Sequence, residues 1–225
     1  MKFTVSEEWK AAYPGAYAGV LDMSGVENPG SNEALDRRKE ELEANLRARF
    51  AGRKQELRAL EPLAAYRAYY KAFKKTYHVQ MQLESVALKG QSIPRVASLV
   101  EAMFVAELKN LLLTAGHDLG VVRPPVTLQV ASGTETYVRL DGQEQQLKAG
   151  DMFIADQEGI LSSIIYGPDQ RTQIAPSTHR VLFTVYAPPG IDEQAVIDHL
   201  HDIEANVRLV APEAETQALD VYGTG

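Results

Sequence analysis

Gly116-His117-Asp118 places an imidazole beside a carboxyl group directly after a glycine. A loop histidine can act as a general base or orient a water molecule, and an adjacent carboxylate can help to hold that water. His117 and Asp118 are therefore candidate catalytic residues. In the alternative interpretation, Asp118 caps the next turn and His117 is an ordinary surface residue.

The second candidate stretch is the loop from Gly167 to Thr172. Within four residues, Asp169, Arg171 and Thr172 supply an acceptor, a fork-shaped donor and a hydroxyl group. This set suits the ammonium and carboxylate groups of an amino acid, or a ribose and a phosphate. An ion pair between Asp169 and Arg171 inside an ordinary hairpin loop is the competing explanation.

Basic and aromatic residues alternate on a helix predicted over residues 64–77, which carries Arg67 and Lys71 among several tyrosines. Such a helix can stack on bases and neutralise phosphates, which makes Arg67 and Lys71 candidate substrate-binding residues. Alternatively, the tyrosines belong to the core and the basic side chains are simply solvated.

Several common reaction classes lack their motifs. The chain has no phosphate-binding glycine loop, no GxSxG nucleophile and no HExxH pair, and it contains no cysteine. His199 and His201 lie two residues apart on a predicted helix, so they point to different faces, and we expect both to face solvent. We therefore predict neither a metal site nor a cofactor.

The composition of the 225 residues is that of a globular protein, with 45% hydrophobic residues and a net charge of −7. No apolar stretch is long enough to span a membrane, and the first ten residues lack the apolar centre of an export signal. We expect a cytoplasmic protein with no membrane association. Any nucleic-acid contact would use a local basic patch on an acidic body.

Helical periodicity dominates the first half of the sequence and strand periodicity the second, which predicts one α+β domain over residues 1–225. The expected helices are 32–50, 64–77, 81–88, 96–113 and one that begins at Asp192; the expected strands are 2–5, 16–23, 126–130, 137–140, 152–155, 160–166 and 181–186. The broad apolar face of helix 96–113 predicts burial against a sheet, with Gly116 leading away from it. Beyond Pro212 we expect a loose acidic tail.

Several short motifs, in a fixed order, resemble a known family. They are Tyr66-Arg67-x-x-x-Lys71-x-Phe73, Leu88-Lys89-Gly90-x-x-Ile93-Pro94, Leu99-Val100-Glu101, Ala155-Asp156-x-x-Gly159, Tyr166-Gly167, Thr172 and Thr178-x-x-Val181-Leu182. This order is similar to that in free-standing relatives of the tRNA-editing (B3/B4) domain of the phenylalanyl-tRNA synthetase β subunit. The resemblance extends over roughly residues 59–188.

The resemblance implies a three-layer fold, with a β-sandwich-like core and helices packed outside. In the synthetase, this domain binds the misacylated tRNA end and hydrolyses a wrongly attached tyrosine. Carried over by position, the residues at or near the pocket would be Arg67, Lys71, His117, Asp118, Asp169 and Thr172.

This sequence also departs from the family pattern at places that would line the pocket. The changed positions are Glu101 and Phe104 in the buried helix, Ser162, Ser163 and Pro168 before the loop aspartate, and Thr184 where the synthetase has a glutamate. An inherited fold therefore does not by itself imply inherited hydrolysis.

Two functions follow as hypotheses. In the first, a stand-alone editing-domain-like protein binds the 3′ end of an aminoacyl-tRNA and hydrolyses a misacylated ester in trans. A water oriented by His117 or Asp118 would attack, while Asp169 and Arg171 hold the amino acid. In the second, the chain is a non-catalytic module for a free amino acid, a similar small ligand or a protein partner.

Overall fold

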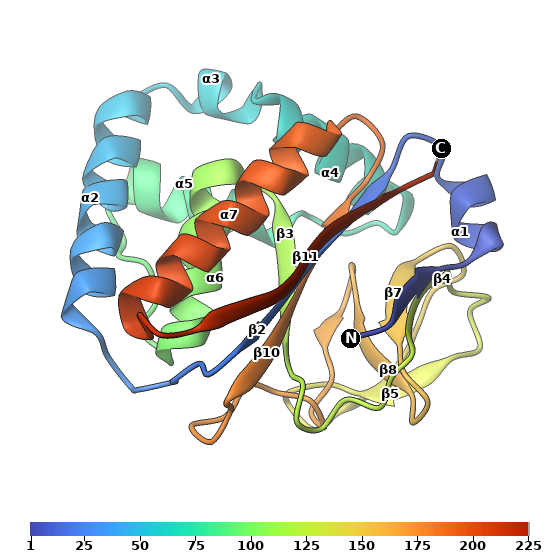
Figure 1. The fold of residues 1–225 in the computed structure, drawn as a ribbon. Coiled ribbons are helices and arrows are strands. Elements are labelled where there is room, and N and C mark those ends of the chain that lie inside the picture. Colours follow the sequence, from blue (N-terminus) through green and yellow to red (C-terminus); the bar gives the residue numbers. More distant parts are fainter. Residues whose placement is uncertain (225) are drawn as a thin grey trace.

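A four-stranded antiparallel sheet forms the centre of the computed structural model, which describes residues 1–224 (Figure 1). Its strands lie in the order β11 (Glu215–Gly223), β2 (Tyr17–Ser24), β10 (Arg180–Ala187) and β3 (Leu113–Asp118). Because β2 and β10 are buried along almost their whole length, both faces of this sheet must be covered.

Helices cover one face of the central sheet (Figure 1). α7 (Glu193–Val210) packs against β2, and α6 (Ser98–Asn110) packs against α7 and β3. α2 (Glu33–Phe50) contacts α5 (His78–Lys89), α6 and α7. The remaining helices are α1 (Glu7–Ala12), α3 (Lys54–Arg58) and α4 (Glu61–Ala72). No helix among the described residues is both long and apolar enough to cross a membrane.

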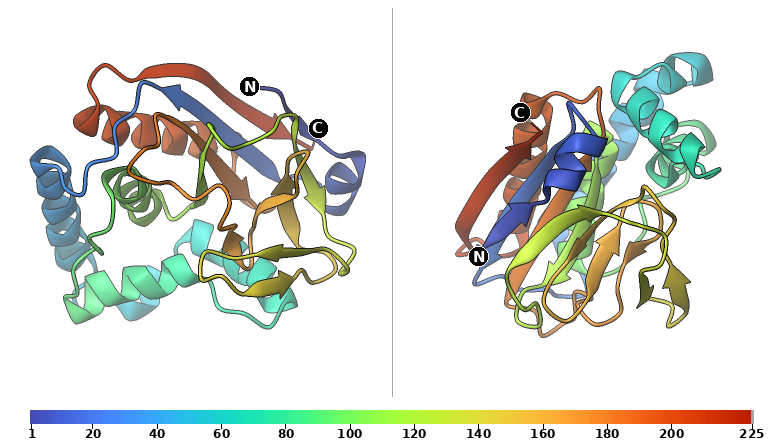
Figure 2. Two further views of the ribbon diagram at one scale, coloured as in Figure 1. Left: turned by 90° about the horizontal axis from the view of Figure 1, so that it is seen from below. Right: turned by 90° about the vertical axis from the view of Figure 1, so that its right-hand side faces the viewer.

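A second, five-stranded sheet lies across the other face (Figure 2). Its order is β1 (Phe3–Val5), β4 (Val126–Val130), β7 (Met152–Ala155), β8 (Ile160–Ser163) and β9 (Gly167–Pro168). β1 runs parallel to β4, and the other neighbours are antiparallel. A separate two-stranded hairpin consists of β5 (Thr136–Val138) and β6 (Glu144–Gln146).

The two sheets are joined by side chains that alternate along β10. Val185 lies opposite Gly19 of β2, and a Cβ atom on Gly19 would be in contact both with Val185 and with side chains of α7, so Val185 faces this helix. The next residue, Tyr186, points to the other face, where its hydroxyl group contacts Ser162 of β8. These layers confirm the predicted α+β fold, with helices packed outside a sandwich of two sheets.

The structure corrects the helix predicted over residues 96–113. α6 ends at Asn110, because Leu111 adopts a left-handed conformation with φ of 64°. The chain then enters β3, so Gly116, His117 and Asp118 lie in a buried strand and not in a loop. The leucines at the end of the helix continue its apolar pattern, which hides this change of structure from the sequence.

Three further predictions about local structure were wrong. The tail after Pro212 is ordered, because β11 pairs with β2 along the edge of the central sheet. The strand predicted over residues 160–166 ends at Ser163. His199 is fully buried on α7, whereas His201 is exposed as expected.

Gly19 sets the distance between β2 and α7. A Cβ atom at this position would lie 2.7 Å from Cγ1 of Val196 and 3.1 Å from Cδ1 of Leu200. We expect Gly19→Ala to lower the free energy of unfolding by about 1–3 kcal/mol, because an added methyl group overpacks the contact. Urea unfolding measures the change. Gly30→Ala is the control, since a Cβ atom there meets nothing within 4 Å, and equal effects of both variants would contradict this account.

Candidate functional site

A cavity of about 270 Å³ lies beside the edge strand β3, where the helical layer meets the second sheet. Its walls come from α6, β3, the end of β8, β9 and residues 173–174. The volume is slightly below the range of about 300–1,000 Å³ that is typical of pockets for drug-sized ligands. The cavity is therefore suited to one group of amino-acid size.

The cavity lining is mainly apolar. The hydrophobic residues in its wall are Val100, Met103, Phe104, Leu113, Ala115, Leu140, Ile164, Pro168, Ile174 and Tyr186. Polar side chains enter at a few places, and they belong to His78, Glu107, Thr114, Ser163 and Gln173. An apolar wall with few polar groups is typical of a site that holds a small ligand in one orientation.

Glu107 is the carboxylic acid in this lining. It lies on α6, is 2% exposed, and its Oε1 accepts a 2.7 Å hydrogen bond from the backbone N–H of Thr114. Burial raises the pKa of Glu107 to about 8, although the hydrogen bond from Thr114 acts in the opposite direction. The carboxyl group is therefore mostly protonated at neutral pH.

A chain of hydrogen bonds connects the cavity wall to the interior of the second sheet. The hydroxyl of Tyr186 lies 2.6 Å from Oγ of Ser162, which lies 3.0 Å from Nε2 of His117. Nδ1 of His117 lies 2.8 Å from Oγ1 of Thr172, whose hydroxyl donates to the carboxylate of Asp169. Five side chains from β10, β8, β3 and the loop after β9 thus form one network.

The carboxylate of Asp169 fixes the direction of this chain. Oδ1 of Asp169 accepts from both the hydroxyl and the backbone N–H of Thr172, so Nδ1 of His117 must donate to Thr172. Nε2 of a neutral His117 then accepts from Ser162, which in turn accepts from Tyr186. The hydroxyls of Ser162 and Thr172 each accept one bond and donate another, so the donors of the chain all point from Tyr186 toward Asp169.

Burial is the main reason why His117 stays neutral. Desolvation and, to a smaller extent, the positive charge of Arg171 together lower the pKa of its imidazole to about 3, against the opposing effect of Asp156. His117 is fully buried and does not line the cavity. A direct contact between its ring and a ligand in the cavity would require this wall to move.

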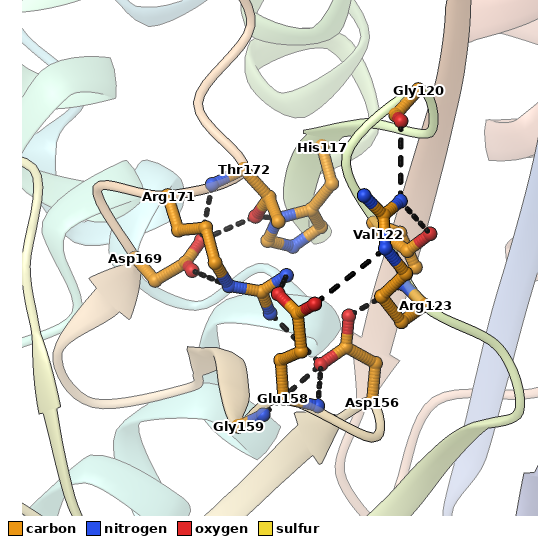
Figure 3. A network of polar contacts seen from close by, with 10 residues as sticks. All are labelled: His117, Gly120, Val122, Arg123, Asp156, Glu158, Gly159, Asp169, Arg171 and Thr172. Atoms are coloured by element: carbon orange, nitrogen blue, oxygen red, sulfur yellow. Dashed lines mark hydrogen bonds and ion pairs between the residues drawn. The ribbon is translucent and has the colours of Figure 1, made fainter.

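Arg171 lies at the centre of a group of acids near the Asp169 end of the hydrogen-bond network (Figure 3). Its guanidinium is 2.8 Å from Asp156, 3.2 Å from Glu158 and 3.6 Å from Asp169. Burial pushes the pKa of Asp156 upward, but the N–H groups of Arg123 and Glu158 and the Arg171 charge hold it below its ordinary value. The ion pair between Arg171 and Asp169 that the sequence left as an alternative is present.

Asp118 follows His117 but belongs to a different group of contacts. Its carboxylate accepts from the hydroxyl of Thr178 at 2.7 Å and from the N–H of Gly120 at 2.8 Å. Its own backbone N–H donates to the carbonyl of Thr172 at 2.8 Å. Asp118 thus connects the end of β3 to the chain that leads into β10, and it is absent from the cavity lining.

The other predicted site residues line separate hollows. Asp169 and Arg171 border a surface hollow of about 310 Å³ beside the β5–β6 hairpin. Arg67 and Lys71 border a wide hollow of about 880 Å³ on α4 and the turn that follows it. The two predicted stretches, 116–118 and 167–172, meet at the cavity only through their glycines, because Gly116 and Gly167 both line it. The catalytic and binding roles assigned to these side chains remain predictions.

The sequence pattern did not single out Glu107 or Tyr186, and it marked Ser162 only as a departure from the family pattern. Glu107 carried a usable signal, since it is an acid on the apolar face of α6, three residues after Phe104 and four after Met103. Of the positions at which the sequence departs from the family, Phe104, Ser163 and Pro168 line the cavity, whereas Glu101 and Thr184 do not. Among residues 1–224, no group of three or more His, Asp or Glu side chains is arranged to hold a metal ion.

In sequence, part of the chain is similar to phenylalanine–tRNA ligase β subunits. No family model matches the chain. Over 69 residues, 31% of this chain, it is 30% identical to the phenylalanine–tRNA ligase β subunit of Mycoplasma pneumoniae and 29% identical to that of Mycoplasma genitalium. The match spans 9% of the length of each of these relatives.

The structural comparison extends over nearly the whole chain. The fold matches an N-terminal fragment of the phenylalanyl-tRNA synthetase β subunit from Pyrococcus horikoshii with a TM-score of 0.54 and 13% sequence identity. The match covers 98% of this chain and 50% of the solved chain, so this chain spans about half of that fragment.

Proposed function

We propose that this chain, which is related to the N-terminal, B3/B4-like region of the phenylalanyl-tRNA synthetase β subunit, binds the aminoacylated 3′ end of a tRNA. The observation that carries the proposal is the position of the amino-acid-sized cavity next to a basic hollow. Tyr77 lines the hollow and His78 lines the cavity, so the start of α5 separates the two.

The hollow has the charge that a phosphate backbone requires. Four cations border it, from Arg67, Lys71, Lys74 and Lys75, and none forms an ion pair within residues 1–224. Nζ of Lys75 lies 5.5 Å from the centre of the Tyr166 ring, close to the strands that border the cavity. On a protein with a net charge of −7, such a patch favours local contact with a polyanion.

Ester hydrolysis is the reaction that such a complex would support. A water molecule beside the ester carbonyl must lose a proton, and the chain from Tyr186 through Ser162 to His117 offers a route for it away from the cavity. Asp169 would stabilise the charge that develops on His117 through Thr172. Asp118 would keep β3 in place.

A non-catalytic binding role is the second candidate, and one observation favours it. His117 has a pKa of about 3 and is separated from the cavity by Ser162 and Tyr186, which makes it a weak base at neutral pH. Turnover of a panel of mischarged tRNAs separates the two roles. Deacylation above background that falls in His117→Gln, with tRNA affinity unchanged, supports the enzyme; no turnover for any tRNA removes it.

The basic hollow makes a specific prediction about tRNA binding. Replacing both Lys71 and Lys75 by alanine should weaken the affinity and reduce the slope of log K against log salt by about 1.4–1.8, because two phosphate contacts are lost. Filter binding across a salt series measures this slope.

The matched control is the double alanine variant of Arg37 and Lys89, two exposed cations that lie on α2 and α5 and do not border the hollow. It removes the same charge and should leave the slope unchanged. Equal slopes for the two double variants would show that the hollow is not the binding surface. If the unaltered protein does not bind tRNA even at low salt, the proposed function is wrong.

A further inference from the structure

We infer that Glu107 recognises the α-ammonium group of the bound residue, and that the cavity therefore selects an aminoacyl ester with a free amino group and an apolar side chain. This inference deepens the proposed function and rests on it for the identity of the ester. Its physical basis is the composition of the cavity wall and the single donor that Glu107 receives.

Glu107 has unused capacity to accept hydrogen bonds. A carboxylate offers about four lone-pair sites, and within the described residues its one hydrogen-bond donor is the N–H of Thr114. Buried polar groups are usually fully hydrogen-bonded. An ammonium group brings three donors to this position, and its positive charge favours the ionised form of Glu107, whose proton is released to solvent. The carboxylate and the ammonium then form a charge-assisted bond in a place that water reaches poorly.

The rest of the wall explains why the ligand would carry an apolar side chain. Phe104 and Met103 lie one helical turn before Glu107 on α6, and Ile164 and Ile174, which lie outside α6, also line the cavity. An ammonium held at Glu107 therefore leaves the remainder of an amino acid among hydrophobic side chains. Burial of this apolar area would supply most of the affinity.

The wall also discriminates between an ester and a free amino acid. No lysine or arginine of the described chain lines the cavity, so a free carboxylate would enter without a cation to balance its charge. A buried unpaired carboxylate is costly, whereas an ester carbonyl is neutral. The cavity is thus complementary to an aminoacyl group whose carboxyl is already esterified, as it is on a tRNA.

Three small probes test this inference without tRNA. L-phenylalanine amide carries the ammonium without a carboxylate, N-acetyl-L-phenylalanine amide lacks the ammonium, and L-phenylalanine carries both charges. By isothermal titration, we expect the amide to bind at least about tenfold more tightly than either of the others. Glu107→Gln should reduce the affinity for the amide at least about tenfold and leave that for the N-acetyl amide unchanged.

Glu107→Gln suits this test because it keeps the shape and the acceptor for Thr114, and its side chain is neutral, as that of Glu107 mostly is in the empty cavity. Glu40→Gln, an exposed acid on α2 without an ion pair among the described residues, is the control for net charge and should change no affinity. Thermal unfolding verifies that both variants are folded.

Three results would overturn the inference. They are equal binding of the amide and the N-acetyl amide, a preference for the amide that persists in Glu107→Gln, and no binding of any probe at millimolar concentration. The outcome of the tRNA-binding assay is independent of these probe measurements. A protein that prefers the amide through Glu107 but does not bind tRNA would retain this ammonium site and lose the proposed function.

Discussion

Replacing Lys39 by methionine is expected to lower the free energy of unfolding by about 3–5 kcal/mol, because one partner of a buried ion pair is removed. Nζ of Lys39 on α2 pairs with the carboxylate of Glu101 on α6, and the two side chains are 5% and 3% exposed. After the substitution, Glu101 keeps only the N–H of Val96, at 2.7 Å, as a donor. Urea unfolding at neutral pH measures the loss.

The double variant Lys39→Met with Glu101→Gln distinguishes a stranded charge from lost packing. The amide of glutamine is neutral and its oxygen can still accept from Val96, so we expect the double variant to recover all but about 1 kcal/mol of the stability. If the effects of the two single substitutions simply add, the stranded charge is not the cause.

A steep loss of stability in acid is the second large effect expected, because the fold keeps His117 and His199 buried and neutral. Desolvation lowers the pKa of each imidazole from 6.5 to about 3. A histidine with a lowered folded-state pKa binds fewer protons in the folded state, so its contribution to stability is complete above pH 6.5 and is lost as the pH falls toward 3. Between pH 6.5 and 5, each histidine accounts for about 2 kcal/mol of that loss.

Two acids act in the opposite direction. Burial raises the pKa of Glu107 to about 8 and that of Asp151 to about 7, so the folded state binds more protons there and loses stability as the pH rises through these values. The four groups together place the maximum of stability between about pH 5 and 6. The histidine contribution is therefore measured as a difference between variants.

Guanidinium unfolding at pH 6.5 and pH 5 provides the measurement. His117→Gln and His199→Gln should each remove about 2 kcal/mol from the difference between the two pH values, whatever their effect on stability at pH 6.5. His201→Gln is the matched control, since His201 lies on the same helix as His199 but is 59% exposed. A pH response of the two buried-site variants that equals that of the control would contradict the assignment.

The layers of the fold could be predicted from the sequence because they depend on periodicity. Leu35, Leu46 and Phe50 mark the buried stripe of α2, and Val126 and Leu128 alternate along β4. The order of short motifs also indicated the correct relationship to the synthetase subunit.

The end of α6 could not be predicted in this way. Leu111 takes a left-handed conformation that a glycine would normally mark, and the leucines on both sides extend the helical pattern. The glycine from which the sequence predicted the end of the helix, Gly116, lies beyond the true end of α6 and inside β3. Because the helix was predicted to end too late, His117 was expected in a loop, whereas it lies in the buried strand β3.

The candidate site was only partly accessible to sequence reasoning. His117, Thr172 and Asp169 were predicted as neighbours in one site, and the structure places them in one hydrogen-bond network. Their connection to the cavity goes through Ser162 and Tyr186, which are far apart in the sequence and carry no motif. Arg67 and Lys71 line a different hollow, on α4 and the turn that follows it.

The position of β2 between β10 and β11 has a consequence for how the chain acquires its structure. Tyr17–Ser24 is synthesised long before its neighbours Arg180–Ala187 and Glu215–Gly223. Phe3–Val5 likewise has its pairing partner, Val126–Val130, far along the chain. Pairing over such sequence separations is entropically costly and slows folding. These two strands therefore remain unpaired while the intervening residues are synthesised, a period in which binding by a chaperone would protect them from aggregation.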